Sequence, residues 1–591
     1  MWLLLGLATI PAWIYLGVVI RYGVNCPIAD EWNPDIGGLF VKWHDRTLRA
    51  ADFWPLDNEH RIVIPRIVIL LLGWLTRFDS RGEMIFTWCC CWATSLMLLW
   101  LIRRDARPLT YAAIGTWFAC NALIFNITQI ENVITGLGMI NVLPTTIIII
   151  QLVVLVSRLS PRLKYWLAMG LAIVATYTFG NGVLAWVCGS IFIAWSDSPR
   201  EVKKRIPALA LWYGVCVVCV VLYMIGYQKP GLSPPLAGPL QTMRYAVIFS
   251  GNLLAYTIGG APWSVFQATA AGAVFLLLFM FCAVYFSRAL LRREEVLCDR
   301  MLVWMAIAVY ALLSTMIASV LRAGNPPNQA TASRYVSYSI YLPIAIFNLL
   351  PMVCGDMVRR WKISRQEWSR NAIRWMPTAF TFATVIFVGT AMRRALWHYF
   401  FMHAERRMAK AALLLDPVLP DNPMITRFLY PWPEKLLPMV TAVNELGLIK
   451  PPLITNPEIS TLVDPVLMGT TCGALEEAQQ VEGAFVFRGW AIDPGEAEPA
   501  DAVVITGEDA SGRPHILAMG EIGVGNNGRG RDDIAARFGN DLYLFSGWVA
   551  SFRFDGALPA GLTQLKISAW TIDITTGRFH KLDGDITLRM Q

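Results

Sequence analysis

Long apolar runs recur along the first 392 residues, and they restrict the fold more than any other feature of the chain. A helix needs about 20 mainly apolar residues to cross the hydrocarbon core of a bilayer. Only 16% of the residues are charged, whereas an ordinary soluble protein has about 25%. The sequence therefore predicts a mainly α, polytopic membrane domain over residues 1–392, with about eleven transmembrane helices. The apolar runs lie at 2–20, 84–102, 110–127, 137–157, 163–180, 182–196, 206–227, 264–287, 300–321, 336–354 and 374–392.

The loops between these runs carry most of the lysines and arginines, which accounts for the net charge of +8 without nucleic-acid binding. The basic loops share one side only if the stretches 62–75 and 244–260 do not cross, and that side is then the cytoplasm. Segment 62–75 is short and contains Pro65 and Arg66, so we expect an interfacial helix. If 244–260 does cross, the orientation of everything after it inverts. The basic loops are 103–104, 158–164, 200–205, 288–293 and 359–374.

With that orientation, the polar loop 21–61, the loop 228–243, the segment 322–334 and everything after residue 393 lie on the outer face. We expect a multi-pass protein of the bacterial inner (cytoplasmic) membrane. The composition changes after the last run. Residues 393–473 are predicted to form an amphipathic helix (393–415) and a Pro-rich connector (416–465).

From residue 474 onward, short runs rich in β-branched and aromatic residues alternate with Gly, Asp and Pro. This pattern predicts an all-β sandwich over residues 474–591, on the outer side of the membrane. The motifs Phe487-Arg-Gly-Trp490 and Phe545-Ser-Gly-Trp548 resemble each other and indicate equivalent strands. Tryptophans in such strands are more often core residues than ligand platforms, and the domain shows no catalytic signature.

Ten of the twelve cysteines lie in or beside apolar segments, where they act as small hydrophobic residues. Cys26 and Cys472 lie in the parts predicted to be outside, and the sequence leaves open whether they pair or stay as thiols. No CxxC pair has histidine partners, so the sequence predicts no metal site. Dependence on a divalent cation stays open, and no firm cofactor is indicated.

The loop after the first apolar run concentrates charge in a chain that is otherwise mostly apolar. It contains Asp30 and Glu31 and, before the next apolar segment, Glu59, His60 and Arg61. Ionisable groups at the mouth of a membrane domain are costly to place and are functional candidates by default.

This arrangement is similar to that of the GT-C superfamily, which comprises membrane glycosyltransferases that use polyprenyl-phosphate-linked sugars. The resemblance lies in a long polar loop with an early acidic pair, a polar cluster before a re-entrant helix, and about eleven spans. It covers roughly the first four hundred residues. It implies that an acidic residue of the first outer loop is the general base toward the acceptor hydroxyl. Asp30, in Ala29-Asp30-Glu31-Trp32, is the residue that matches.

The chemistry of glycosyl transfer asks for the same kinds of residue. A carboxylate must accept the proton of the acceptor hydroxyl, and cations must neutralise the departing lipid phosphate. Arginine suits the second task through its bidentate fork. Arg61 lies on the same predicted outer face as Asp30, and so do Arg322 and Arg334 of the second polar insertion. Arg61 is a further candidate for phosphate binding, and Glu59, His60 and Tyr335 are candidates for donor or acceptor binding. We therefore expect Arg322 or Arg334 to hold the donor phosphate.

Each of these residues also has a structural interpretation. Asp30 and Glu31 suit a solvated helix end, and His60 suits an interfacial histidine satisfied by Glu59 or Asp57. Arg61 suits a snorkelling anchor. The Arg334-Tyr335 pair suits an interface anchor.

The predicted function is transfer of a sugar from a polyprenyl-phosphate donor to an envelope glycan or lipid-linked acceptor. Two alternatives stay open: a transporter or flippase of a lipid-linked glycan, and a non-catalytic glycan assembly or binding protein. The internal repeats with discontinuous helices that many transporters show are not evident in the sequence. The sequence does not specify the sugar, the acceptor or the anomeric outcome.

Overall fold

The computed structural model describes the chain except residues 34–36, 106–108, 196–201, 229–233, 255–261, 361–366, 465–470, 524–529, 554–563 and 590–591. Parts of the predicted loops 200–205, 228–243 and 359–374, and the end of 244–260, therefore lie outside the described residues. The chain divides into two compact units, each described here by itself. We call them the helical unit (Met1–Gly23, Arg49–Leu71 and Arg81–Tyr399) and the barrel unit (Val24–Leu48, Leu72–Ser80 and Phe400–Gln591).

Eight helices among the described residues are long and apolar enough to cross a membrane. Three more apolar helices, Val63–Thr76, Tyr111–Ile124 and Gly180–Trp195, are shorter. The mainly helical fold predicted from the apolar runs is thus confirmed, and the length and composition of these helices support a membrane-embedded protein. The number of about eleven spans stays a prediction. The eight are Trp2–Tyr22, Ser80–Asp105, Gly136–Val156, Lys203–Met224, Trp263–Leu291, Glu295–Arg322, Ser333–Arg360 and Asn371–Leu415.

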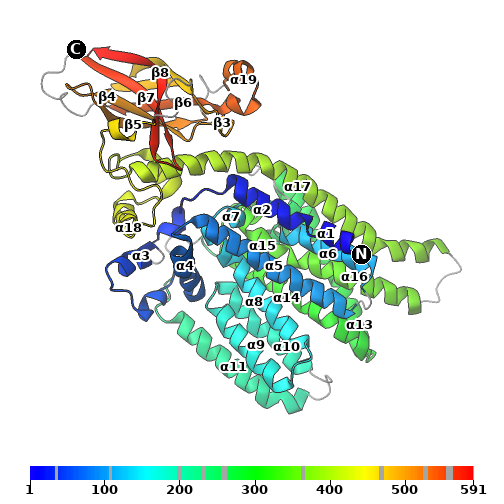
Figure 1. Ribbon diagram of the computed structural model, residues 1–591. Helices are drawn as coiled ribbons and strands as arrows, with labels where there is room; N and C mark the ends of the chain where they lie inside the picture. The colour runs from blue at the N-terminus through cyan, green and yellow to red at the C-terminus, as the bar shows by residue number, and fades with distance from the viewer. Residues whose placement is uncertain are drawn as a thin grey trace. The chain divides into compact units, whose positions relative to one another are not determined.

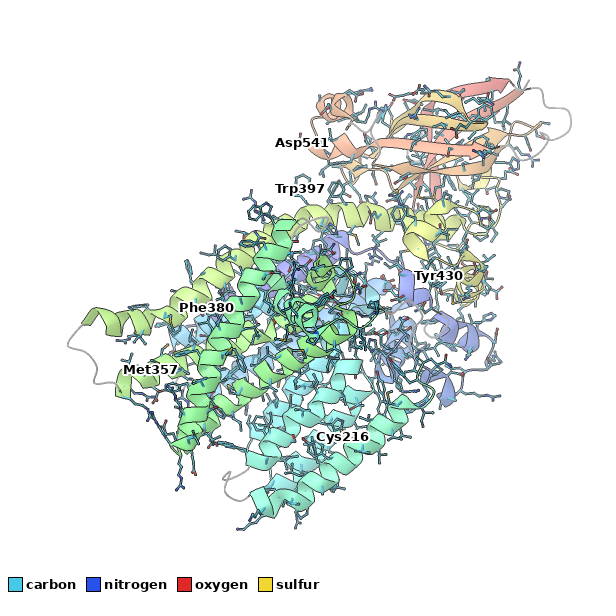
Figure 2. The ribbon with its side chains drawn as sticks, turned by 180° about the vertical axis from the view of Figure 1, so that it is seen from behind. Cys216, Met357, Phe380, Trp397, Tyr430 and Asp541 are labelled. Carbon is cyan, nitrogen blue, oxygen red and sulfur yellow. The ribbon has the colours of Figure 1, made fainter. Side chains whose placement is uncertain are left out.

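The helices of the helical unit include a pair at the N-terminus, a group drawn in cyan in Figure 1, and a group drawn in green. Figure 2 labels Cys216 on α11 and Phe380 on α17. The helices are α1 (Trp2–Leu7), α2 (Ile10–Tyr22), α4 (Val63–Thr76), α5 (Ser80–Asp105), α6 (Tyr111–Ile124), α7 (Ile130–Val133), α8 (Met139–Val156), α9 (Pro161–Thr176), α10 (Leu184–Trp195), α11 (Val202–Met224), α12 (Pro239–Ser250), α13 (Pro262–Leu291), α14 (Glu295–Arg322), α15 (Val336–Ser339), α16 (Tyr341–Arg360) and α17 (Glu367–Leu415). The barrel unit takes α4 from Leu72 and α17 from Phe400.

Burial separates central helices from peripheral ones. In the span Ser333–Arg360, 89% of the apolar window is buried inside the protein, whereas in Lys203–Met224 the share is 11%. A helix that is apolar all round and also exposed needs an apolar solvent. The exposed Val217, Val218 and Val221 of α11 therefore fit a lipid-facing helix.

Helix α12 has only 12 residues, about 18 Å of helix, too short for a hydrocarbon core of about 30 Å. Gln241 Nε2 donates to the carbonyl of Ala323 (2.7 Å), and Asn252 Nδ2, just beyond the helix, donates to the carbonyl of Ala330 (3.4 Å). Both ends of this segment thus bond to the same inter-helix connection. The described part of 244–260 lies along one end of the helical unit and does not traverse it.

The connections between helices form two ends of this unit. We call one the loop end: it comprises 49–62, 125–138, 177–183, 225–228 and 323–335. Segment 49–62 contacts Phe179 and Ile225, Arg334 contacts Glu131, and Arg322, at the end of α14, joins these two groups through Glu59. At the opposite end, Arg104 bonds to the carbonyl of Asp299 (3.1 Å), and Arg360 bonds to Glu294. Several of the basic loops predicted from the sequence therefore do gather at one end.

The barrel unit contains a closed seven-stranded barrel, and the predicted sandwich is wrong. The strand order is β1-β8-β7-β4-β5-β6-β2-β3, and β1 also pairs with β2, which closes the ring and leaves β3 outside it. Alternating strands with short turns are common to sandwiches and barrels, so the pattern could not decide between them. Bulges bend strands, and β1 is irregular between Leu475 and Glu477, just after Ala474, which pairs with both β2 and β8. The strands are β1 (Gly473–Val481), β2 (Ala484–Asp493), β3 (Glu498–Pro499), β4 (Ala502–Glu508), β5 (Pro514–Ile522), β6 (Gly547–Arg553), β7 (Gln564–Asp573) and β8 (Arg578–Arg589).

The two similar motifs of the barrel lie on neighbouring antiparallel strands. Trp490 of β2 pairs with Gly547 of β6, and Gly489 pairs with Trp548. Trp490 and Trp548 are 3% and 1% exposed, so both are core residues, as the sequence favoured.

The Pro-rich connector predicted from the sequence is packed on the barrel. The amide of Ile459 donates to Pro514 O (3.2 Å), and that of Asp464 donates to Phe579 O (2.8 Å). The predicted amphipathic helix 393–415 is the last part of α17, continuous with the predicted span before it. Other elements of this unit are η1 (Ala29–Trp32), α3 (Gly37–His44), a π-helical turn (Ile425–Leu429), α18 (Pro433–Glu445), α19 (Asp532–Phe538) and η12 (Asp541–Phe545).

Candidate functional site

Two arginine–carboxylate pairs lie at the loop end of the helical unit. In the first, Arg322, the last residue of α14, bonds through Nη2 to Glu59 Oε1. The Arg322 side chain is 32% exposed and that of Glu59 is 13% exposed. Both residues are candidates from the sequence, and the structure brings them together.

His60 lies next to this pair. Its Nε2 is 4.0 Å from Glu59 Oε1, and its ring packs on Phe179, with 3.9 Å between the ring centroids. Burial, together with the positive charge of Arg322, lowers the pKa of His60 to about 3. His60 is therefore neutral at physiological pH and can exchange hydrogen bonds without adding charge. Its Nδ1 is buried and has no hydrogen-bond partner in the described part of the chain.

Arg61 has a different environment from Arg322. It is 2% exposed, and its guanidinium donates to the backbone carbonyls of Tyr223 (2.9 Å), Trp54 and Ile225. The guanidinium also stacks over the Trp54 ring, 4.7 Å from its centroid. A guanidinium occupied by three carbonyls favours a structural clamp over a phosphate ligand.

In the second pair, Arg334 Nη1 donates to Glu131 Oε1 (2.7 Å), while the Arg334 amide (3.0 Å) and Ser333 Oγ (2.7 Å) donate to Oε2. These contacts lower the pKa of Glu131: burial opposes the shift, but the Arg334 charge and the three hydrogen bonds outweigh it. The pair remains accessible, since the Arg334 side chain is 45% exposed and that of Glu131 is 40% exposed.

A chain of side-chain amides fixes the backbone of Arg334. Asn132 Nδ2 donates to the Arg334 carbonyl (3.1 Å), Asn141 Nδ2 donates to Asn132 Oδ1 (2.9 Å), and Tyr338 Oη donates to Asn141 Oδ1 (2.8 Å). The guanidinium of Arg334 also lies over the Tyr335 ring, 5.2 Å from its centroid. Arg334 is therefore held at its backbone while its side chain stays accessible.

Tyr335 stacks on Phe249, with 4.9 Å between ring centroids, and packs against the core around α12. This packing suits the anchor interpretation of Tyr335 at least as well as ligand binding.

Asp30 and Glu31 belong to the barrel unit, whereas the arginine pairs belong to the helical unit. Glu31 is buried, and its Oε2 accepts the amide of Ile28 (3.0 Å). Asp30, its neighbour in η1, is exposed. The prediction that Asp30 faces the arginines of the helical unit stays a prediction.

Glu131 is the residue that sequence reasoning missed. It is the one acidic residue between 106 and 195, in a polar stretch that separates two apolar runs. That isolation is the signal that could have identified it, because a lone carboxylate at a helix end of a membrane domain needs a partner. Its arginine follows 203 residues later in the sequence, which the sequence alone could not indicate.

Cys26 and Cys472 are both buried free thiols of the barrel unit. Burial raises the pKa of Cys26 to about 12 and that of Cys472 to about 11. No group of three His, Cys, Asp or Glu side chains in the described ranges is arranged to hold a metal ion. The question of a divalent cation stays open.

Comparison with protein-family models, with curated proteins and with solved structures finds no match to this chain.

Proposed function

We propose that this protein is a membrane glycosyltransferase that moves a sugar from a polyprenyl-phosphate-linked donor to an envelope glycan or a lipid-linked acceptor. The observation that carries the proposal is the pair of accessible arginines, Arg322 and Arg334, at the loop end of an otherwise apolar helical unit. A lipid-linked donor is divided in the same way into an apolar and a charged part. Its hydrocarbon chain suits the membrane, and its phosphate suits the arginines at the membrane surface.

In this mechanism the acceptor hydroxyl attacks the anomeric carbon, its proton passes to Asp30, and the bond from that carbon to the phosphate oxygen breaks. Negative charge then develops on the departing polyprenyl phosphate, where Arg334 and Arg322 stabilise it. Glu131 orients the Arg334 fork. His60 and Glu59 lie beside Arg322, where they contact donor or acceptor. Asp30 is a better base than Glu31, because Glu31 already caps the Ile28 amide.

The decisive experiment measures sugar transfer and donor binding separately. Purified protein is given polyprenyl phosphate carrying a series of hexoses and pentoses, and release of polyprenyl phosphate is followed. Asp30→Asn keeps the size of the side chain but removes proton acceptance, so turnover should fall by about 10²–10⁴-fold with donor binding nearly intact. Asp45→Asn, which changes another exposed carboxylate of the same unit, is the matched control.

Unchanged turnover in Asp30→Asn would remove the proposed base and favour a non-catalytic glycan-binding protein. Movement of intact lipid-linked glycan across vesicles, without release of polyprenyl phosphate, would favour the flippase alternative. Loss of donor binding in Asp30→Asn would instead place Asp30 at the phosphate.

The proposed mechanism also fixes an orientation in the bacterial inner membrane. Cysteines introduced in 103–108 and 288–299 should react only from the cytoplasm, and cysteines after residue 393 only from outside. Labelling of the tail only after the inner membrane is permeabilised would invert the orientation and move the candidate site to the cytoplasmic face.

A further inference from the structure

A cavity of about 150 Å³ lies within the barrel unit, and neither arginine pair of the loop end contributes to its lining. Its walls come from the last part of α17, the π-helical turn, strand β3, the end of β5 and the end of η12. Figure 2 labels Tyr430, which follows the π-helical turn, and Asp541, at the start of η12. All of these elements belong to one unit, so the cavity is formed by a single compact body.

One wall of the cavity is aromatic. The rings of Phe400, Phe401 and Phe545 contact one another. The Phe545 centroid is 5.4 Å from that of Phe400 and 5.3 Å from that of Phe401, and the latter two are 5.5 Å apart. Phe401 is 40% exposed. Such a cluster offers an apolar surface to a flat ligand face.

The floor of the cavity is a fixed ionic network. Arg407, on α17, bonds to Asp501 and to Glu498 (2.8 Å). His403 Nε2 lies 3.7 Å from Glu498 Oε2. Because Arg407 and Glu498 are 7% and 2% exposed at their side chains, the floor is preorganised and rigid.

At the mouth, Arg427 Nη1 bonds to Glu521 Oε1 (2.8 Å), and the guanidinium lies over Phe428, 4.6 Å from the ring centroid. The side chains of Arg427 and Glu521 are 57% and 24% exposed, so both can contact a ligand. The mouth therefore offers a hydrogen-bond donor and an acceptor side by side, next to the aromatic wall.

Size and charge together select the ligand. A cavity of about 150 Å³ accommodates one six-membered ring and is smaller than the roughly 300–1,000 Å³ of drug-sized sites. Around it, Glu405, Glu498 and Glu521 outnumber the arginines Arg407 and Arg427. A phosphate would meet this excess of carboxylates, whereas a neutral ring with hydroxyls around its edge could both donate and accept.

We infer that this cavity is a binding site for a single neutral pyranose residue of a glycan, separate from the site of sugar transfer. The apolar C–H face of the sugar stacks on the exposed ring of Phe401, and the Phe545 ring, at 86° to it, contacts the edge of the sugar. Its hydroxyl groups donate to Glu521 and accept from Arg427. The role of such a site is to hold a glycan chain, and binding needs no catalytic step.

The test uses the full chain in phosphatidylcholine nanodiscs, so that no sugar-headed detergent competes. The probes are the methyl glycosides of glucose, galactose, mannose, rhamnose and N-acetylglucosamine, followed by saturation-transfer NMR. At least one should bind saturably, with a dissociation constant on the order of 1 mM. Phe401→Ala and Glu521→Gln should each weaken that binding by about two- to tenfold.

The chain offers matched controls for both variants. Phe538 has the same 40% exposure as Phe401 but lies on α19. Glu508 is 26% exposed and pairs with Lys566, much as Glu521 pairs with Arg427. Phe538→Ala and Glu508→Gln should leave binding unchanged, and Glu521→Gln keeps the test informative if Phe401→Ala does not fold.

Absence of saturable binding by all five glycosides would overturn the inference, as would binding that neither Phe401→Ala nor Glu521→Gln weakens. Saturable binding of glycerol phosphate in place of the sugars would show a lipid-headgroup site and would also overturn it. None of these results depends on sugar transfer, so they are independent of the test of the proposed function.

Discussion

The helical unit and the barrel unit each contain an arginine bonded to carboxylates, but the two arginines are buried to very different extents. The Arg334 side chain of the helical unit is 45% exposed, and that of its partner Glu131 is 40% exposed. Arg407 of the barrel unit is 7% exposed, and its partners Glu498 and Asp501 are 2% and 9% exposed. An exposed pair contributes little to stability and can exchange partners with a ligand, whereas a buried pair cannot be broken without leaving an unpaired charge.

The carboxylates of the two units differ in the same way. Hydrogen bonds and the Arg334 charge lower the pKa of Glu131 in spite of burial. Burial raises the pKa of Asp416, in the barrel unit, to about 6. Its Oδ2 is buried without a hydrogen-bond partner among the described residues. The surroundings of Glu131 thus stabilise its charged form, whereas the surroundings of Asp416 destabilise its charged form. Four predictions test this contrast.

The largest effect is expected from removing the buried arginine. Arg407→Leu removes the guanidinium that Glu498 and Asp501 share in the interior, which should cost about 3–5 kcal/mol. Hydrogen exchange of the peptides covering β3 and β4 reports the local opening free energy. A loss below about 1 kcal/mol would mean that the buried and exposed pairs do not differ as argued.

Asp416→Asn should stabilise the barrel unit at neutral pH. The pKa of Asp416 in the folded protein, about 6, lies above the ordinary value of 3.8. The wild-type residue therefore favours folding most below pH 3.8, and this contribution to stability is lost as the pH rises to about 6. The variant should therefore gain on the order of 1–3 kcal/mol at pH 7.5 and show a smaller gain at pH 4.5. Hydrogen exchange around residues 410–416 measures this, and an equal gain at both pH values would contradict the burial argument.

Arg334→Lys keeps the charge but loses the planar fork, so it should weaken the binding of polyprenyl phosphate by about tenfold. The unfolding of the helical unit should change little, because the pair is accessible. Arg359→Lys, at the opposite end of the unit and 69% exposed, is the control and should bind normally. If Arg359→Lys weakens binding as much as Arg334→Lys, the loop end is not the phosphate site.

The smallest effect is expected for Arg513→Gln in the barrel unit. Arg513 is 54% exposed and pairs with Glu458 (3.2 Å) and Asp509 (3.1 Å). Loss of such surface pairs should cost about 0–1 kcal/mol, and added salt should reduce that cost further. An effect as large as that of Arg407→Leu would show that burial is not the variable that separates the two kinds of pair.

Particular residues show how far the sequence could predict the candidate site. It identified Glu59, His60, Arg322 and Arg334 because charge is rare in an apolar chain and stands out at helix ends. It could not pair Glu131 with Arg334, because loops distant in sequence meet only when the helices pack. It selected Asp30 over Glu31 only through the family resemblance. The physical difference comes from the backbone of η1, which turns Glu31 toward the Ile28 amide and leaves Asp30 exposed.

The connector illustrates the same limit. Its prolines suggested a linker, yet its backbone bonds to β5 and β8. Proline restricts the local backbone but says nothing about which surface the segment packs on.

The sequence by itself determined that most of this chain is helical and membrane-embedded, that its C-terminal part is built of β-strands, and that its charges gather where helices end. Those features follow from local periodicity and from the cost of placing charge in an apolar medium. Only the tertiary structure decided that the strands close into a barrel, that Glu131 holds Arg334, and that Arg407 is buried while Arg334 is accessible. Each of these depends on contacts between segments far apart in the chain, which packing sets and local pattern does not encode.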